Sequence, residues 1–305
     1  MADVANPAII IGLGGTGKWV VTYVKKNLLE TYGGKIPDNI RLLSFDTTSK
    51  QGSKDGKAEE EDVRVGNVQL DEGSEFTALT GNIRNMCVDI RDKGDYASIG
   101  SWLQAAEYLK STDTDAFDIS RGAGQKRPFG RMAIFYDLQQ SVRASLSNKL
   151  ESAITAVIGA NQQSKATVVV YIVASLAGGT GSGMLIDVAH LARWFIYQKL
   201  GTTEGYTVRG FVALHNTFNS VIRTNQIQPN AFAAMRELDR FMLVFDKQYP
   251  IVYNPANPTL QTIYGGKLGK LFDNCFLLDA TREQMPLDGV DPRYGVFLLL
   301  PTVSL

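Results

Sequence analysis

Two short runs of apolar residues end abruptly in glycine-rich turns, and each turn is followed by a segment with helical periodicity. The first run is Ile9–Ile11, and the second is "ATVVVYIVAS" at residues 166–175. A brief β-branched run that stops at glycine is typical of a buried parallel strand. The repeated order of strand, turn and helix therefore predicts an α/β fold, with a Rossmann-like, mostly parallel sheet and helices on both faces.

Other segments extend this pattern. We expect strands at 40–45, ending at Asp46, near 208–214 and at 275–279, and helices from Lys18 to about Gly33, over 184–200 and near 230–243. From Gly130 to Ile158 apolar residues recur every fourth position, a spacing that drifts by about 40° per step on an α-helix. This long helical segment should therefore curve against the sheet or break once.

Composition bounds the domain organisation. A chain of 305 residues that is 44% apolar can bury one large core, so we expect a single domain over 1–305. Residues from about 49 to 75 are rich in charge and poor in apolar anchors, which predicts a polar, mobile surface excursion there.

Charge and residue counts exclude several classes of protein. The 31 basic residues equal the 31 acidic residues, so no overall positive field favours nucleic acid or anionic lipid. Two cysteines and two histidines without ligand spacing predict no zinc site, disulfide framework or Ser-His triad. No apolar run is long enough to span a membrane. We expect a cytoplasmic protein.

The first glycine turn fits two nucleotide-binding patterns in part. Its candidate phosphate contacts are Gly12, Gly14, Gly15, Thr16, Gly17 and Lys18. A P-loop needs a hydroxyl after the lysine to ligate Mg²⁺, and Trp19 stands there instead. The dinucleotide pattern needs an acidic residue on the ribose, for which Asp46 is a candidate. An NAD(P)-dependent oxidoreductase therefore stays open as an alternative.

Two more glycine turns favour a polyphosphate ligand. The second turn offers backbone and hydroxyl donors from Gly178, Gly179, Thr180, Gly181 and Ser182. The third turn contains Gly122, Ala123 and Gly124, with basic residues at 121, 126, 127 and 131 around it. Glycine lets backbone N–H groups approach phosphate oxygens, and a helix N-terminus adds partial positive charge.

These turns resemble the tubulin/FtsZ superfamily, and in particular its prokaryotic tubulin-like proteins. The family signature G-G-G-T-G-[ST]-G is matched from Ala177 to Gly183, with alanine in place of the first glycine. Gly122, Ala123 and Gly124, followed after five residues by Gly130 and Arg131, are similar to the family loop that faces the γ-phosphate in FtsZ. The turn at 12–17 is similar to the family's first phosphate loop.

The resemblance implies a GTP-binding, filament-forming cytoskeletal GTPase. It implies GTP or GDP with Mg²⁺ as ligands, Asp46 near the metal or ribose, and self-association in the full-length form, where a neighbouring subunit completes hydrolysis. The family's guanine-binding asparagine is not matched, since Asp279–Arg282 stand at that place. Asn225 or Asn230 could contact the base or ribose instead, or simply cap a helix. Lys18, usually asparagine in FtsZ, could contact phosphate or point to solvent.

The resemblance also implies a second, activation domain after a long central helix. Here the last expected strand ends near Asp279 and the sequence stops at Leu305. We expect this activation domain to be absent or truncated and GTP hydrolysis by this chain to be weak, with no assigned catalytic residue. A scaffold that holds nucleotide without turnover is a further alternative.

Overall fold

The computed structural model describes residues 5–48, 63–93, 99, 102–111, 113, 117–139, 145–162, 166–218, 224–253 and 261–279. Its main feature is a six-stranded sheet in the order β3-β2-β1-β4-β5-β8. The strands are β1 (Ala8–Leu13), β2 (Ile40–Asp46), β3 (Phe76–Ala78), β4 (Val168–Ser175), β5 (Tyr206–Ala213) and β8 (Asn274–Leu278). Every neighbouring pair is parallel, which confirms the predicted α/β class.

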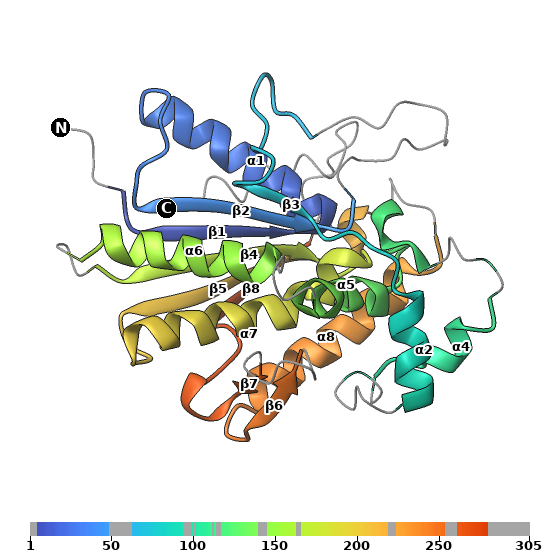
Figure 1. Ribbon diagram of the computed structural model, residues 1–305. Coiled ribbons are helices and arrows are strands. Elements are labelled where there is room, and N and C mark those ends of the chain that lie inside the picture. The colour runs from blue at the N-terminus through green and yellow to red at the C-terminus, as the bar shows by residue number, and fades with distance from the viewer. Residues whose placement is uncertain are drawn as a thin grey trace.

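Helices cover both faces of this sheet. α1 (Gly14–Thr31) lies on one face, and α5 (Arg127–Gln139), α6 (Ser145–Ala160) and α7 (Thr180–Leu200) lie on the other (Figure 1). β1 contributes side chains to the apolar cores on both faces of the sheet, because its side chains alternate between the faces. Ile10 belongs to the core under α1, whereas Ile9 and Ile11 belong to the core under α7. The two apolar clusters hold the site's strands and helices together.

Smaller elements surround these layers. α8 (Ile227–Leu243) packs against α7, and α2 (Arg84–Lys93) packs against the short α4 (Ala105–Tyr108). The described residues include the 3₁₀ segments η2 (Ile119–Arg121), η3 (His215–Phe218) and η5 (Gly266–Leu268). β6 (Tyr249–Val252) and β7 (Gln261–Tyr264) form a separate antiparallel pair that the sequence analysis did not predict.

The long helical segment expected from Gly130 to Ile158 is divided into α5 and α6. Asp137, near the end of α5, explains the division. Its carboxylate accepts hydrogen bonds from the backbone N–H groups of Ser145 and Leu146, at 3.1 and 3.0 Å, so it caps the first turn of α6. Of the two expectations for this segment, the helix that breaks once is confirmed, and the continuous curved helix is wrong.

The expected surface excursion at 49–75 falls only in part within the described residues. Residues 49–62 lie outside the described part of the chain, but Val63, Val65 and Leu70 are 2%, 6% and 4% exposed. These buried apolar side chains attach residues 63–70 to the domain. Within the described residues, no helix is both long and apolar enough to cross a membrane.

Candidate functional site

The candidate site lies where the strand order reverses, at the carboxyl ends of β1 and β4. In open parallel sheets this switch point forms the ligand crevice, because the loops on its two sides diverge. α1 begins directly after β1, at Gly14 rather than at the expected Lys18, and α7 begins at Thr180. The first and second glycine turns therefore become the N-termini of two helices, side by side.

Glycine is required where these helix starts touch. Gly14 has φ of +67°, and a Cβ added to it would lie 2.9 Å from the backbone nitrogen of Gly181. A Cβ on Gly181 would lie 2.7 Å from the carbonyl oxygen of Leu13. Gly12 and Gly17 likewise face each other, with a Cβ on Gly12 only 2.3 Å from the Gly17 oxygen. These four glycines serve backbone packing.

Both helix N-termini suit an anion. Among the described residues, neither α1 nor α7 has a side-chain cap or an acidic residue in its first turn. Their first N–H groups and helix dipoles therefore present partial positive charge that no acidic residue of their own first turns offsets. Gly178, just before α7, faces open space: within the described chain no non-neighbouring atom lies within 4 Å of its Cβ position.

The third glycine turn packs onto the second. A Cβ on Gly179 would lie 2.8 Å from the backbone nitrogen of Lys126, and one on Gly130 would lie 2.3 Å from the oxygen of Gly179. Gly122 and Gly124 have φ values of +96° and +54°, and the Cβ position of Gly124 is open among the described residues. The structure thus brings together the three turns that the sequence analysis selected.

Asn230 holds two of these turns in place. It lies in the first turn of α8, is 8% exposed, and donates through Nδ2 to the carbonyl oxygens of Gln125, at 2.7 Å, and Ala177, at 3.1 Å. Both amide hydrogens are therefore committed to backbone oxygens on the second and third turns. Asn225, the other asparagine considered, is exposed. Gln125, which the sequence analysis overlooked, adopts φ of 59° at this junction.

Asp46 and two threonines form the polar side of the site. Asp46 ends β2, is 6% exposed, and accepts a hydrogen bond from the Thr47 backbone N–H at 2.7 Å. The Thr47 and Thr180 hydroxyls are 2.8 Å apart, which joins the end of β2 to the start of α7. Burial raises the pKa of Asp46 to about 6. Thr47 was not among the predicted site residues, although it directly follows Asp46, the acidic residue that ends β2.

Lys18 is buried beside this group. The residue is only 6% exposed, and its ammonium nitrogen lies 3.6 Å from the centroid of the Phe76 ring. Its charge partly offsets the effect of burial on the pKa of Asp46. The sequence left two roles open for Lys18. The one in which its side chain points to solvent is wrong, because the residue is buried.

Ser182 is already engaged by protein groups. Its hydroxyl donates to the carbonyl oxygen of Gly178 and accepts from the Nε of Arg127 at 3.2 Å. Arg127 also pairs with Glu237 of α8, with 3.2 Å between Nη1 and Oε1. Within the described chain, no group of three or more His, Cys, Asp or Glu could hold a metal ion.

Asp46→Asn should change how stability depends on pH. The folded-state pKa of about 6 lies above the ordinary value of 3.8, so the folded chain retains a proton that the unfolded chain releases. The free energy of unfolding should therefore fall as pH rises from about 4 to 6, and Asp46→Asn should remove up to about 3 kcal/mol of this dependence. Urea unfolding of both proteins at several pH values measures it. A constant difference between them would contradict the assignment.

A family model described as "Tubulin like" matches residues 9–290. No curated protein matches the chain. Among solved structures, CetZ2 from Haloferax volcanii, titled as a GTPγS-bound protofilament, is 13% identical with a TM-score of 0.46, over 96% of this chain and 58% of its own. CetZ from Methanosaeta thermophila is 10% identical, with a TM-score of 0.46 over 97% and 52%.

TubZ from Bacillus thuringiensis, titled as a GTPγS-form protofilament, is 13% identical, with a TM-score of 0.42 over 99% of this chain and 57% of its own. The chain thus spans between half and three fifths of the length of these three structures.

Proposed function

The chain belongs to the tubulin-like family, whose model matches residues 9–290, and from this premise we propose that the crevice binds a guanine nucleotide, GTP or GDP, with Mg²⁺. The observation that carries the proposal is the convergence of two uncapped helix N-termini and a third glycine turn at the carboxyl ends of β1 and β4. Such a site favours several linked phosphates, because each helix start supplies N–H donors and partial positive charge.

The residues divide into three roles in this proposal. Gly14, Gly15, Thr16, Gly178, Gly179, Thr180 and Ser182 would supply backbone N–H groups to the phosphates, and Gly122, Ala123 and Gly124 would lie near the terminal phosphate. Gly12, Gly17 and Gly181 let the backbones approach closely, and Asn230 fixes the turns. Asp46, Thr47 and Thr180 would accept hydrogen bonds from the water shell of the cation, whose charge would offset that of the phosphates.

We also propose that the full-length protein self-associates and that a neighbouring subunit completes hydrolysis. The support is family membership, together with a described site in which Asp46 is the only carboxylate assigned to the crevice and is largely buried. Such a site binds and orients phosphates without a second carboxylate to activate water. This chain should then turn GTP over slowly. Phosphate release that rises steeply with protein concentration, with polymers visible by light scattering, would contradict slow turnover by this chain.

GTP or GDP should raise the melting temperature when Mg²⁺ is present. At a ligand concentration about 100 times Kd, binding adds about 2.7 kcal/mol to the free energy of unfolding, which corresponds to a shift of about 5 °C. Differential scanning fluorimetry with GTP, GDP, ATP and NADH tests this, and chromatography of the nucleotide released on denaturation identifies a bound species. Stabilisation by NADH and not by GTP would favour the oxidoreductase alternative instead.

A further inference from the structure

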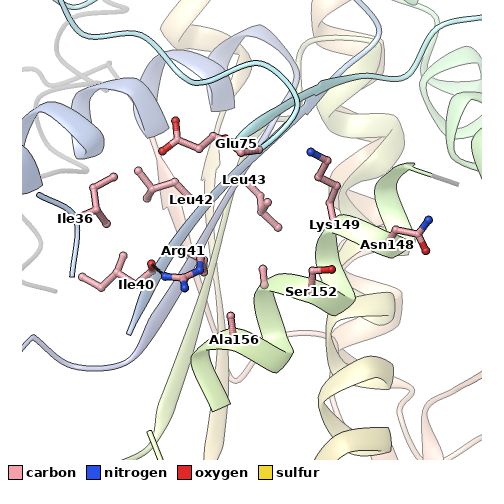
Figure 2. A pocket seen from close by; sticks show the side chains of 12 residues that line it. Ile36, Ile40, Arg41, Leu42, Leu43, Glu75, Asn148, Lys149, Ser152 and Ala156 are labelled. Atoms are coloured by element: carbon pink, nitrogen blue, oxygen red, sulfur yellow. Dashed lines mark hydrogen bonds between the residues drawn. The ribbon is translucent and has the colours of Figure 1, made fainter. Parts of the chain in front are cut away.

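A second cavity lies far along β2 from the glycine turns. It has a volume of about 570 Å³ and lies at the first half of β2, between that strand and α6. Figure 2 shows side chains from β2 and from α6 facing each other across it. Because the glycine turns follow the carboxyl ends of β1 and β4, this groove is separate from the proposed nucleotide site.

The edge of β2 is open along this groove. β3 pairs with β2 only at Ser44–Asp46, so among the described residues no strand pairs with Ile40–Leu43 on that side. The Ser44 N–H and the Asp46 carbonyl point toward the β3 side, at 2.6 Å from Glu75 O and 2.7 Å from Leu79 N. Strand alternation therefore points the N–H and C=O of Leu42, a residue 3% exposed, to the same unpaired edge, which the Arg41 side chain crosses at Ile40.

Apolar side chains flank this edge on both faces of the sheet. Ile36, Ile40 and Leu42 lie on the α1 side, with the latter two packed in its core. Leu43 and Ala153 lie on the α6 side, and Ala156 continues the α6 wall. A peptide strand added to β2 would direct alternate side chains toward these two walls, as in recognition by strand addition.

The charges of the groove select an acidic occupant. Arg41 donates from Nη1 to the carbonyl oxygens of Asp38 and Ile40, both at 2.8 Å, and Lys149 lines the opposite wall. Neither cation has a carboxylate partner in the described part of the chain. Glu75, the carboxylate that lines the groove, shares the ammonium of Lys25 with Asp71, at 2.6 and 3.2 Å. Arg41 and Lys149 are therefore the two cations of the groove that a carboxylate partner on a peptide could still pair with, beside an apolar strand edge.

We propose that this groove binds an extended, acidic peptide segment of a partner protein, which adds as a strand to the edge of β2 at Leu42. Main-chain hydrogen bonds to Leu42 supply the pairing, the two apolar walls receive alternate side chains, and carboxylates pair with Arg41 and Lys149. Arg41 would leave the carbonyl oxygen of Ile40, which then accepts a hydrogen bond from the added strand.

The test uses a fluorescein-labelled peptide of about eight residues, in which valine alternates with threonine and glutamates occupy both ends. Fluorescence anisotropy should show saturable binding to the chain. Lys149→Glu should weaken this binding about tenfold, because it replaces an attractive pair with a repulsive one. The matched control is Lys267→Glu, which makes the same charge change at an exposed lysine outside the groove and should leave binding unchanged.

Two altered peptides separate the contributions. A peptide with N-methyl groups along its central backbone should lose binding, because it cannot pair with the strand edge, and a version with lysines in place of the glutamates should bind at least tenfold more weakly. Equal binding of the N-methylated or lysine peptide would overturn the proposal. So would an equal loss in Lys149→Glu and Lys267→Glu, or the absence of binding to the unchanged chain.

Discussion

Gly178→Asp is expected to weaken GTP binding by about 100- to 1000-fold while leaving the chain folded. The Cβ position of Gly178 is open among the described residues, so the new side chain has space directly before the N-terminus of α7. There its carboxylate would face the phosphates, and two like charges about 4 Å apart repel by about 4 kcal/mol at the effective dielectric constant near a protein surface. Isothermal titration calorimetry with GTP and Mg²⁺ measures the loss.

Gly178→Asn is the matched control, because it has the same shape without the charge. It should retain binding to within about tenfold. Gly179 is a poorer position for this test: a Cβ there would lie 2.8 Å from the backbone nitrogen of Lys126, so any side chain would displace the third turn as well. If Gly178→Asp and Gly178→Asn bind GTP equally well, the second turn does not hold phosphate.

Asp187→Ala should lower the free energy of unfolding by about 3–5 kcal/mol. Asp187 of α7 is fully buried and accepts two hydrogen bonds from Arg131 of α5, at 2.6 and 3.2 Å, and one from the Tyr253 hydroxyl at 2.9 Å. Its removal leaves the Arg131 guanidinium, which lies 4.5 Å from the Trp102 ring centroid, without its counter-charge. Urea unfolding followed by circular dichroism measures the loss.

Two variants separate the parts of this cluster. Tyr253→Phe removes one hydrogen bond and should cost about 1 kcal/mol. The double variant Arg131→Met with Asp187→Leu replaces the ion pair with apolar side chains and should be more stable than Asp187→Ala. A loss below about 1 kcal/mol in Asp187→Ala would show that the cluster adds little to stability.

The sequence was most informative where local pattern and long-range packing agree. β1, β2 and β4 follow from their continuous apolar runs, because strands buried on both faces need no alternation. The first two glycine turns were recognised because strand, turn and helix occur consecutively there. The third was recognised from its glycines and the basic residues around it, just before a helical segment. That they meet in one crevice follows from the sheet order, which no local pattern specifies.

The remainder depends on contacts between distant residues. The break before α6 depends on the Asp137 carboxylate reaching Ser145 and Leu146, and a periodicity of apolar residues contains no such information. Burial of Lys18 depends on Phe76, and the position of Asn230 depends on carbonyl oxygens from two other turns. The sequence allowed two roles each for Lys18 and Asn230, and only residues distant in the sequence decide between them.

The backbone contacts among the glycine turns have a kinetic consequence. Gly14 with Gly181, Gly179 with Lys126, and Gly130 with Gly179 pack so closely that one turn would displace another if it moved far. We therefore expect the three turns to be ordered before a nucleotide binds, so that binding requires little further ordering of them. Association should be a single step whose rate rises linearly with nucleotide concentration, and differences in affinity among nucleotides should appear mainly in their dissociation rates.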